Sequence, residues 1–478
     1  MTKGIPGRYT SFAAAVTVRL AAVSAAAVLY CSCASEPQPP KPTLKAGFGE
    51  TVITPQTNLP MRGFARSQVS EGVHDDLHAR SVAFEGPDGS AAVMISLSLC
   101  TVGRDIVKSI RKPVTEATGI PAERIIVSCN HTHAGPSVEK GGEEFRRFLV
   151  ERASESAITA WNSRFPAKVG SGSATLLDVG RNRRRLLYGG RHPDPEVLVL
   201  KVEDATGALR GVLFNYGCHP STLDWRNRLI SEDWPYYAIR DIKAGTADSV
   251  WVAFFQGAEG DINAGYSAEL SAVGVPMPIR TFDYIEFMGS RMAETVLDLL
   301  PSIETDDVPL NVAQGISDYP LRSSFPVSLN EAERNAARTQ SKLDALIRSG
   351  VDENSRSLDE VRAEVFITGL RQNTARAFYG EKDRPSATPI EQQAVRLGDT
   401  VFAAIPGEVF SEIGRRIKNE SPAARTFLLG LANGYTGYMP TRNEYTEGAY
   451  EVDGSRYSAD AEDACVAATT ALIRKTGF

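Results

Sequence analysis

The sequence predicts an α/β fold in which mixed sheets are flanked by helices. Short runs rich in β-branched and aromatic residues indicate buried strands, and segments with apolar residues at helical spacing stand between several of them. Within residues 91–127 a strand, a helix and a second strand follow one another, an order typical of a parallel strand pair. The composition, 42% hydrophobic and 23% charged, is that of a soluble globular protein.

The first predicted elements form a hairpin and a strand–helix–strand unit. Residues 81–84 and 91–97 flank a Pro-Asp-Gly turn, which predicts two antiparallel strands. The segment 104–118 has helical spacing, although Pro113 can break or kink a helix. The strand at 124–127 follows it directly, and we therefore expect a parallel pair at this point.

A second helix and three more strands are predicted in the middle of the chain. Residues 143–165 place apolar side chains at roughly helical intervals, as a core-facing helix does. Strands are expected at 197–202, 211–216 and 250–255. The last of them runs into a glycine-rich stretch that permits a tight turn but lacks the Lys-Ser/Thr ending of a phosphate-binding loop.

The last third of the chain combines a long helical region with two strands and a closing helix. Residues 330–349 are amphipathic and rich in Ala, Glu, Arg and Lys, and residues 351–362 continue in the same polar style. This pattern predicts a helical insertion near 328–362 that covers the core or the site. Strands are expected at 390–397 and 400–405, and a helix at 460–475.

The N-terminus has the composition of an export signal. Basic residues precede the apolar run 20–30, which is too short to span a bilayer, and small residues with cysteines follow it. We therefore expect a bacterial lipoprotein signal at 1–33 with lipidation at Cys33, a proline-rich tether at 34–45 and one domain at 46–478. Ordinary secretion, with cleavage near Ala34, is the alternative. The lipoprotein hypothesis places the protein in the cell envelope of a bacterium, anchored through lipid to a membrane.

Charge and cysteine content exclude two classes of protein. The net charge of −6 disfavours a nucleic-acid binder, which needs a basic face. Four cysteines lie beyond the signal, too few for a disulfide framework in so long a chain, and they are sufficiently explained as buried small residues. The four are Cys100, Cys129, Cys218 and Cys465. Whether any two of them form a disulfide is left open.

Residues 128–136, with the sequence Ser-Cys-Asn-His-Thr-His-Ala-Gly-Pro, hold the first candidate site. They follow a strand and end at a Gly-Pro break. Residues two apart on extended backbone project to the same side, so His131 and His133 can direct two imidazoles into one pocket. A metal site is one interpretation of this pair. A turn whose histidines bond backbone carbonyls is the other.

Other polar side chains stand at the ends of later strands. His219 precedes a proline at the end of strand 211–216, and Glu408 follows strand 400–405. Ligands gather at strand ends in α/β sheets, so convergence of His131 and His219 on one site is expected. The basic cluster 181–185 is either a solvated loop or an anion clamp made of guanidinium groups.

The order of these motifs resembles that of the neutral, non-lysosomal ceramidases and their bacterial relatives, over nearly the whole mature chain. The motifs are Met-Arg-Gly-Phe-Ala at 61–65, Gly-Val-His at 72–74 with Ala-Arg at 79–80, His-Thr-His at 131–133 with Gly-Pro at 135–136, Asn-Arg at 182–183, His-Pro-Ser at 219–221, Gly-Asp at 260–261, Pro-Gly-Glu at 406–408, and the tyrosine-rich run 433–451.

The resemblance implies a ceramidase-type catalytic domain that holds Zn²⁺. Such a site leaves room for a water whose pKa zinc lowers to about 7 and which can attack an amide carbonyl. By position the implied ligands are His131, His219, Glu408 and, with a weaker match, Tyr438.

The same resemblance implies catalytic roles for three further residues. His133 would donate or accept protons, Arg183 would clamp the substrate carbonyl or oxyanion, and Tyr450 would donate a further hydrogen bond.

Two departures from the family pattern bear on the substrate. Ceramidases carry a catalytic serine and a proline after the Gly-Asp pair, and this chain has Asn263 and Ala264 there. The immunoglobulin-like C-terminal domain of ceramidases is also not expected. We therefore expect an exported zinc hydrolase that cleaves an N-acyl amide of a small molecule or lipid. The alternatives are a zinc hydrolase acting on an ester or glycan-linked group, and a non-catalytic binding lipoprotein with a structural metal.

Overall fold

The computed structural model describes residues 43–478 except 57, 65–68, 187–188, 268–278, 354 and 381. The expected signal at 1–33, its lipidation residue Cys33 and most of the expected tether lie outside the described residues. Within the described part of the chain, every helix is too short or too polar to cross a membrane.

The larger of two main sheets has eight strands and is mixed, as predicted. In sheet order the strands are β11 (Trp251–Gln256), β9 (Leu209–Tyr216), β8 (Glu196–Asp204), β6 (Phe165–Thr175), β1 (Lys45–Val52), β3 (His78–Glu85), β4 (Ala91–Leu97) and β5 (Ile125–Cys129). The expected hairpin is the antiparallel pair β3 and β4. The expected parallel unit is β4 and β5, joined by helix α1 (Arg104–Thr118), which continues through Pro113.

The second main sheet has four strands and packs face to face on the first. Its strands, in order, are β13 (Leu310–Pro320), β14 (Ala387–Leu397), β15 (Thr400–Ala404) and β17 (Arg425–Leu429). Phe84 and Met94 of the larger sheet share a buried cluster with Phe402 and Phe427 of the smaller one. The rings of Phe402 and Phe427 lie 4.6 Å apart, so aromatic packing joins the two sheets at their centre.

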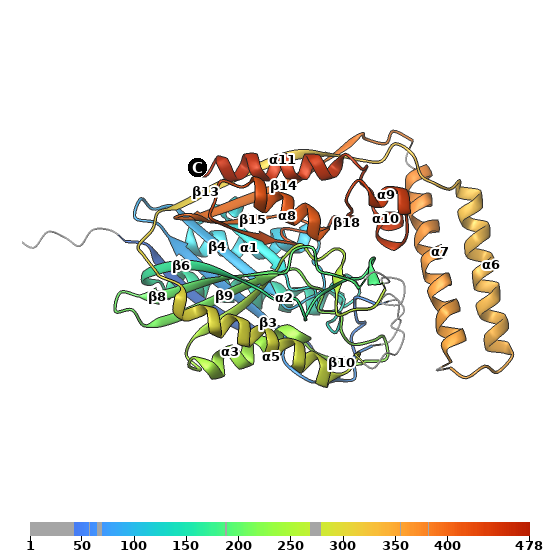
Figure 1. Ribbon diagram of the computed structural model, residues 1–478, viewed down its shortest axis with the longest axis horizontal. Coiled ribbons are helices and arrows are strands. Elements are labelled where there is room, and N and C mark those ends of the chain that lie inside the picture. Colours follow the sequence, from blue (N-terminus) through green and yellow to red (C-terminus); the bar gives the residue numbers. More distant parts are fainter. Residues whose placement is uncertain are drawn as a thin grey trace, which may run out of the picture. The chain divides into compact units, whose positions relative to one another are not determined.

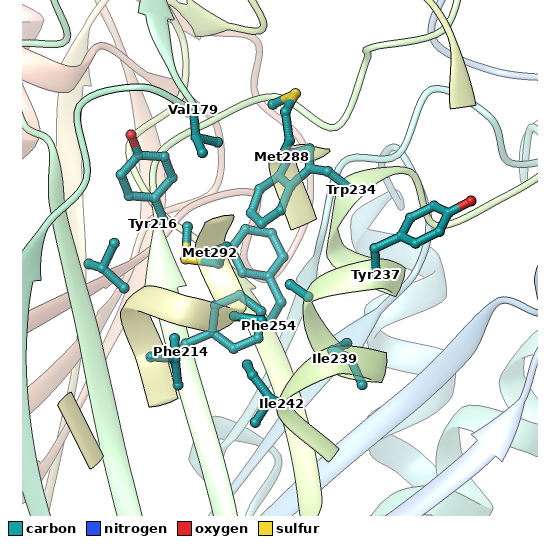
Figure 2. Close-up of a cluster of buried hydrophobic side chains, with 14 of the residues drawn as sticks. Val179, Phe214, Tyr216, Trp234, Tyr237, Ile239, Ile242, Phe254, Met288 and Met292 are labelled. Atoms are coloured by element: carbon teal, nitrogen blue, oxygen red, sulfur yellow. The ribbon is translucent and has the colours of Figure 1, made fainter. Parts of the chain in front are cut away.

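Helices cover the outer face of each sheet, which gives four layers (Figure 1). On the larger sheet lie α1, α2 (Gly142–Asn162), α3 (Trp234–Gly245) and α5 (Phe282–Leu299); on the smaller lie α8 (Ser411–Glu420) and α11 (Ala461–Arg474). Because both faces are covered, β4 is buried at every position instead of alternating. Figure 2 shows the core under α3 and α5, where the Trp234 and Phe254 rings meet at 4.7 Å.

The helical region expected near 328–362 is a hairpin of α6 (Leu329–Arg348) and α7 (Arg356–Gly380), which extends beyond the predicted end. Ser328 caps α6, because its side chain accepts a hydrogen bond from the Glu331 amide at 3.3 Å. Figure 1 shows α7 beside the short helices α9 (Glu444–Glu447) and α10 (Tyr450–Gly454).

Short elements complete the loops around the strand ends. The two-stranded pairs are β10 (Leu229–Ile230) with β2 (Gly72–Val73), β12 (Ile262–Asn263) with β7 (Arg181–Asn182), and β16 (Glu408–Val409) with β18 (Tyr438–Met439). The 3-10 turns are η1 (Ala122–Arg124) and η3 (Leu300–Ser302). In the last strand pair Glu408 and Tyr438 are register partners, which brings two predicted site residues together.

Candidate metal centre

Three side chains from distant parts of the chain converge at the ends of the strands. His131 follows β5, His219 follows β9 and Glu408 begins β16. Glu408 Oε2 lies 3.1 Å from His219 Nε2 and 3.4 Å from His131 Nε2, and the three side chains are at most 2% exposed. The convergence expected for the two histidines is therefore present, with the carboxylate between them.

The backbone contacts of the two histidines determine which nitrogen faces the centre. His131 Nδ1 lies 2.7 Å from the Cys100 carbonyl, and His219 Nδ1 lies 2.9 Å from the carbonyls of Glu259 and Ile262. A carbonyl oxygen only accepts hydrogen bonds, so both Nδ1 atoms carry the hydrogen. A neutral ring then presents its Nε2 lone pair to the Glu408 carboxylate.

Lone pairs that converge on one point need a positive charge among them. Two imidazole nitrogens and a carboxylate oxygen, all within 4.8 Å of one another, are a donor set that Zn²⁺ accepts. The backbone carbonyls behind both rings are the outer contacts that fix the orientation of ligating histidines. The residues present therefore fit a zinc ion.

The three candidate ligands differ in their protonation states. Burial and the neighbouring Arg183 guanidinium lower the pKa of His219 to about 4, which keeps its ring neutral. Burial opposes ionisation of Glu408, but the charges and hydrogen bonds of the two histidines outweigh it and hold the pKa of Glu408 well below its usual range. Burial opposes protonation of His131, but the neighbouring Cys100 and the Glu408 carboxylate outweigh it and raise the pKa of His131 well above its usual range, so this ring has to release a proton when it binds a metal.

The backbone of the His-Thr-His turn differs from the expectation. Extended backbone was expected, but β5 ends at Cys129 and His131 has a φ of +76° in the left-handed region. The turn is held instead by Thr132, whose hydroxyl donates to the Ser231 carbonyl at 2.7 Å. The rings of His131 and His133 still meet, with 3.4 Å between their Nε2 atoms.

His133 lies beside the three converging groups and is buried against Gly63. Burial and the positive charges of its neighbours lower the pKa of His133 well below its usual range, so the ring is neutral. A Cβ on Gly63 would lie 2.4 Å from His133 Cγ, and Gly63 has a φ of +110°. The close approach explains the glycine in the Met-Arg-Gly-Phe motif.

Arg183 lies behind the same centre. Its Nε donates to Glu451 Oε1 at 2.8 Å, its Nη2 donates to the Gly260 carbonyl at 2.8 Å, and its Nη1 is 3.3 Å from His219 Nε2. The guanidinium carbon lies 5.5 Å from the ring centroid of Tyr438 and 5.9 Å from that of Tyr450. The structure thus brings Arg183, Tyr438 and Tyr450 together around the candidate ligands.

The rest of the basic cluster has a role that neither sequence interpretation anticipated. Arg184 pairs with Glu444 and Glu451, and Arg185 pairs with Glu444 and Glu447. Arg184 and Arg185 therefore bind carboxylates of the chain itself, while Arg183 of the same cluster lies beside the candidate ligands. The cluster attaches the segment that carries Tyr450 to the segment that carries Arg183.

Tyr435 is a site residue that the sequence interpretation missed. Its hydroxyl donates to Glu408 Oε1 at 2.8 Å. Tyr438, the expected fourth ligand, packs its ring 5.5 Å from that of Tyr450. The signal for Tyr435 was its position in the same Tyr-Thr-Gly-Tyr run, three residues before Tyr438.

A pocket of about 300 Å³ opens onto these groups. Its lining includes the candidate site residues His131, His133, Glu408, Tyr435, Tyr438 and Tyr450. The remaining lining residues are Met61, Arg62, Gly63, Phe64, Cys100, Thr101, Ser137, Lys140 and Phe366. His219 and Arg183 lie directly behind this lining, within contact of the groups that form it.

Comparisons with known proteins find similarity to neutral ceramidases. No family model matches the chain. Neutral ceramidase A of Dictyostelium discoideum is 20% identical over 85% of this chain and 69% of its own length. Neutral ceramidase of Pseudomonas aeruginosa is 24% identical over 86% of this chain and 69% of its own length. A crystal structure of neutral ceramidase from Pseudomonas aeruginosa superimposes with a TM-score of 0.70 at 20% identity, covering 90% of this chain and 74% of that one.

The chain is therefore similar to the neutral ceramidases in sequence and shares their fold. The ceramidase-type fold expected from the sequence is thereby confirmed. Asn263, which replaces the serine expected in this family, uses its side chain to form a turn. Its Nδ2 donates to the Tyr266 carbonyl at 2.9 Å and its Oδ1 accepts from the Gly265 amide at 2.8 Å. The side chain is fully buried, and an amide is not a nucleophile.

Glu259 is a second group near the ceramidase-type centre that the sequence interpretation missed. Its side chain is fully buried, and neither carboxylate oxygen has a hydrogen-bond partner among the residues that the structure describes. Burial raises the pKa of Glu259 well above its usual range, so the carboxyl is neutral. The four cysteines at 100, 129, 218 and 465 are buried and form no disulfide within the described part of the chain.

Proposed function

We propose that the protein is a zinc-dependent hydrolase that cleaves an N-acyl amide bond. The observation that carries this proposal is the convergence of two imidazole Nε2 atoms on the Glu408 carboxylate, beside a pocket that His131 and Glu408 line. Similarity to neutral ceramidases supports amide hydrolysis of the ceramidase type.

In this proposal His131, His219 and Glu408 would hold the zinc, and Tyr438, the register partner of Glu408, is the candidate fourth ligand. Bound zinc supplies Lewis acidity at the substrate carbonyl and lowers the pKa of the attacking water. His133, which is neutral and lies 3.4 Å from His131, accepts the proton released on attack and returns it to the amine that leaves.

The developing oxyanion needs hydrogen-bond donors that are already in position. Tyr438 and Tyr450 line the pocket, and the Arg183 guanidinium carbon lies 5.5 and 5.9 Å from their ring centroids. These donors stabilise negative charge without having to move during the reaction. Such preorganised stabilisation is usually the largest contribution to the rate enhancement in acyl transfer. Because Asn263 cannot attack a carbonyl, the proposal assigns attack to water.

The experiment that tests this proposal combines metal analysis with hydrolysis assays. After chelation and reconstitution, we expect one zinc per chain, and cleavage of acyl amides that is lost and regained with the metal. Glu408→Gln should lose both. His74→Ala is the matched control, because His74 lies outside the candidate centre. Its Nε2 is 2.9 Å from the Tyr237 hydroxyl. Zinc binding without amide cleavage, or cleavage of esters alone, would contradict the proposal.

Export and lipid anchoring remain part of the proposal. Their support is the signal-like composition of residues 1–33. Cells fed a labelled fatty acid should incorporate the label into the wild-type protein, and Cys33→Ser should abolish incorporation and release the protein from the membrane fraction. Equal labelling of the variant would exclude Cys33 as the lipidated residue.

A further inference from the structure

We infer that helix α7 restricts the substrate to compact acyl amides and that Phe366 sets the limit. This inference rests on the proposed amide hydrolysis and names the class of substrate for the same pocket. The evidence is that ion pairs attach α7 to the rest of the chain at two points, and that Phe366 lies between these two points.

The first attachment point of α7 is the buried carboxylate of Asp359, which is 2% exposed. Its Oδ2 lies 3.5 Å from Arg226 Nη2, and its Oδ1 accepts from Arg362 Nη1 at 3.3 Å. Both guanidinium groups also lie over the Trp225 ring, at 4.9 and 5.3 Å. Trp225 and Arg226 belong to the loop that follows His219, so this end of α7 is fixed to one side of the centre.

The second attachment point is Arg371, whose Nε donates to Asp453 Oδ2 at 3.1 Å. Asp453 is 3% exposed and lies in α10, the short helix that begins at Tyr450. Between Asp359 and Arg371 the axis of α7 advances about 18 Å, at 1.5 Å per residue. The helix therefore reaches from the loop after His219 to the helix that carries Tyr450.

Phe366 lies between the two attachment points, on the same face of α7 as Asp359. It lies seven residues after Asp359, two turns of helix, which places both side chains on one face. Its ring contacts that of Tyr450 at 5.7 Å, and it is one of the residues that line the pocket. The pocket volume of about 300 Å³ is at the lower end of the range for ligand sites.

Helix α6 supports α7 from the side away from the pocket. Thr339 and Thr368 share a hydrogen bond of 2.7 Å, and Lys342 pairs with Glu364 at 2.8 Å. Arg376 pairs with Glu333 at 3.0 Å near the end of α7. Because α7 is fixed at both ends and supported along its length, a long acyl chain has to displace Phe366 or extend around it.

The test is a series of acyl amides of one chromogenic amine, with acyl chains from acetyl to palmitoyl. For the zinc-loaded wild-type protein, we expect kcat/KM at least about tenfold higher for chains of up to six carbons than for palmitoyl. Phe366→Ala should raise the palmitoyl value by about tenfold and leave the acetyl value within about threefold. Phe366 is partly exposed, so the variant should fold. Phe366→Leu should shift the profile in the same direction.

Phe378→Ala is the matched control, because it removes an aromatic ring from the same helix outside this pocket. It should leave the chain-length profile unchanged. A wild-type profile that is flat, or one that neither Phe366 variant changes, would overturn the inference while amide hydrolysis stands. Failure of the zinc-loaded wild type to cleave any amide would overturn the proposed function, and with it this inference.

Discussion

Tyr435 donates its hydroxyl hydrogen to Oε1 of Glu408 at 2.8 Å, on the opposite side of the carboxylate from the two histidines. The histidines approach Oε2, at 3.1 and 3.4 Å. The two oxygens of Glu408 therefore have different partners, and the carboxylate has one orientation. A ligand fixed in this way is ready to bind a metal without rearrangement.

Removing the Tyr435 hydroxyl should weaken zinc binding. In Tyr435→Phe the ring stays and the Glu408 carboxylate loses a hydrogen bond, so we expect zinc affinity to fall about tenfold, the lower end for an outer contact. Tyr438→Phe is the informative counterpart. If Tyr438 is the fourth ligand, its loss should cost more affinity than the loss of Tyr435. Competition with a chromophoric chelator measures both constants, and an unchanged value for Tyr435→Phe would contradict the role given to this contact.

Arg183→Ala should lower turnover more than metal content. The guanidinium lies beside Tyr438 and Tyr450, where it can stabilise the oxyanion, and we expect kcat/KM to fall about 100-fold. Zinc should remain, because the three candidate ligands keep their backbone contacts. Arg185→Ala is the control, since Arg185 pairs with Glu444 and Glu447 away from the pocket. Equal losses of zinc and activity in Arg183→Ala would make this arginine structural.

Glu232 should control the stability of the fold in acid. Its buried carboxylate accepts from Arg80 at 2.8 and 2.9 Å and from Ser98 at 2.8 Å, and it lies 2.8 Å from His78 Nδ1. Burial opposes its ionisation, but the charge of Arg80 and these hydrogen bonds lower the pKa of Glu232 to about 2, from an ordinary value of 4.5. A lowered folded-state pKa stabilises the fold above pH 4.5, and this stability is lost as the pH falls toward 2.

Glu232→Gln removes this contribution. We expect the free energy of unfolding at pH 7 to fall by about 3 kcal/mol, because Arg80 loses its buried partner. The difference between wild type and variant should shrink as the pH falls from 4.5 toward 2. Urea unfolding across this pH range measures the difference. Glu85→Gln, in a partly exposed ion pair, is the control and should cost less than about 1 kcal/mol.

Gly63→Ala should disturb His133 without removing the metal. The new Cβ would lie 2.4 Å from His133 Cγ, and the left-handed backbone at Gly63 adds strain. We expect activity to fall about 100-fold, as when a catalytic group is displaced by about 1 Å, with zinc content retained. Gly89→Ala has the same backbone cost, since its φ is +81°, but its Cβ meets no atom within 4 Å. Equal effects of the two substitutions would show that backbone strain alone is responsible.

Local pattern was sufficient to predict eight of the twelve strands in the two main sheets, because each of these eight is a short apolar run. Strands such as β6 and β13 were not predicted, because small and polar residues interrupt their apolar positions. Local pattern also placed His131, His219 and Glu408 at strand ends. The left-handed conformation of His131 could not be predicted, because long-range contacts such as that of Thr132 with the Ser231 carbonyl fix the turn.

Contacts between distant segments account for the other differences. The partners of Arg184 lie about 260 residues later in the chain, where a local pattern carries no information about pairing. The sequence alone does not distinguish Tyr435 from Tyr438 as the neighbour of Glu408. The pairing of β16 with β18 determines how each tyrosine is placed relative to this carboxylate. Glutamate is usually found at protein surfaces, yet Glu259 is fully buried.

The three candidate ligands come from separate segments, and His219 and Glu408 alone are 189 residues apart. An ion held by all three would act as a reversible cross-link between β5, β9 and β16. Because such a cross-link must open before these segments can separate, mass action would favour the folded state whenever zinc is present. Zinc supply would then determine the resistance of the protein to heat and proteases, and so its lifetime as well as its turnover.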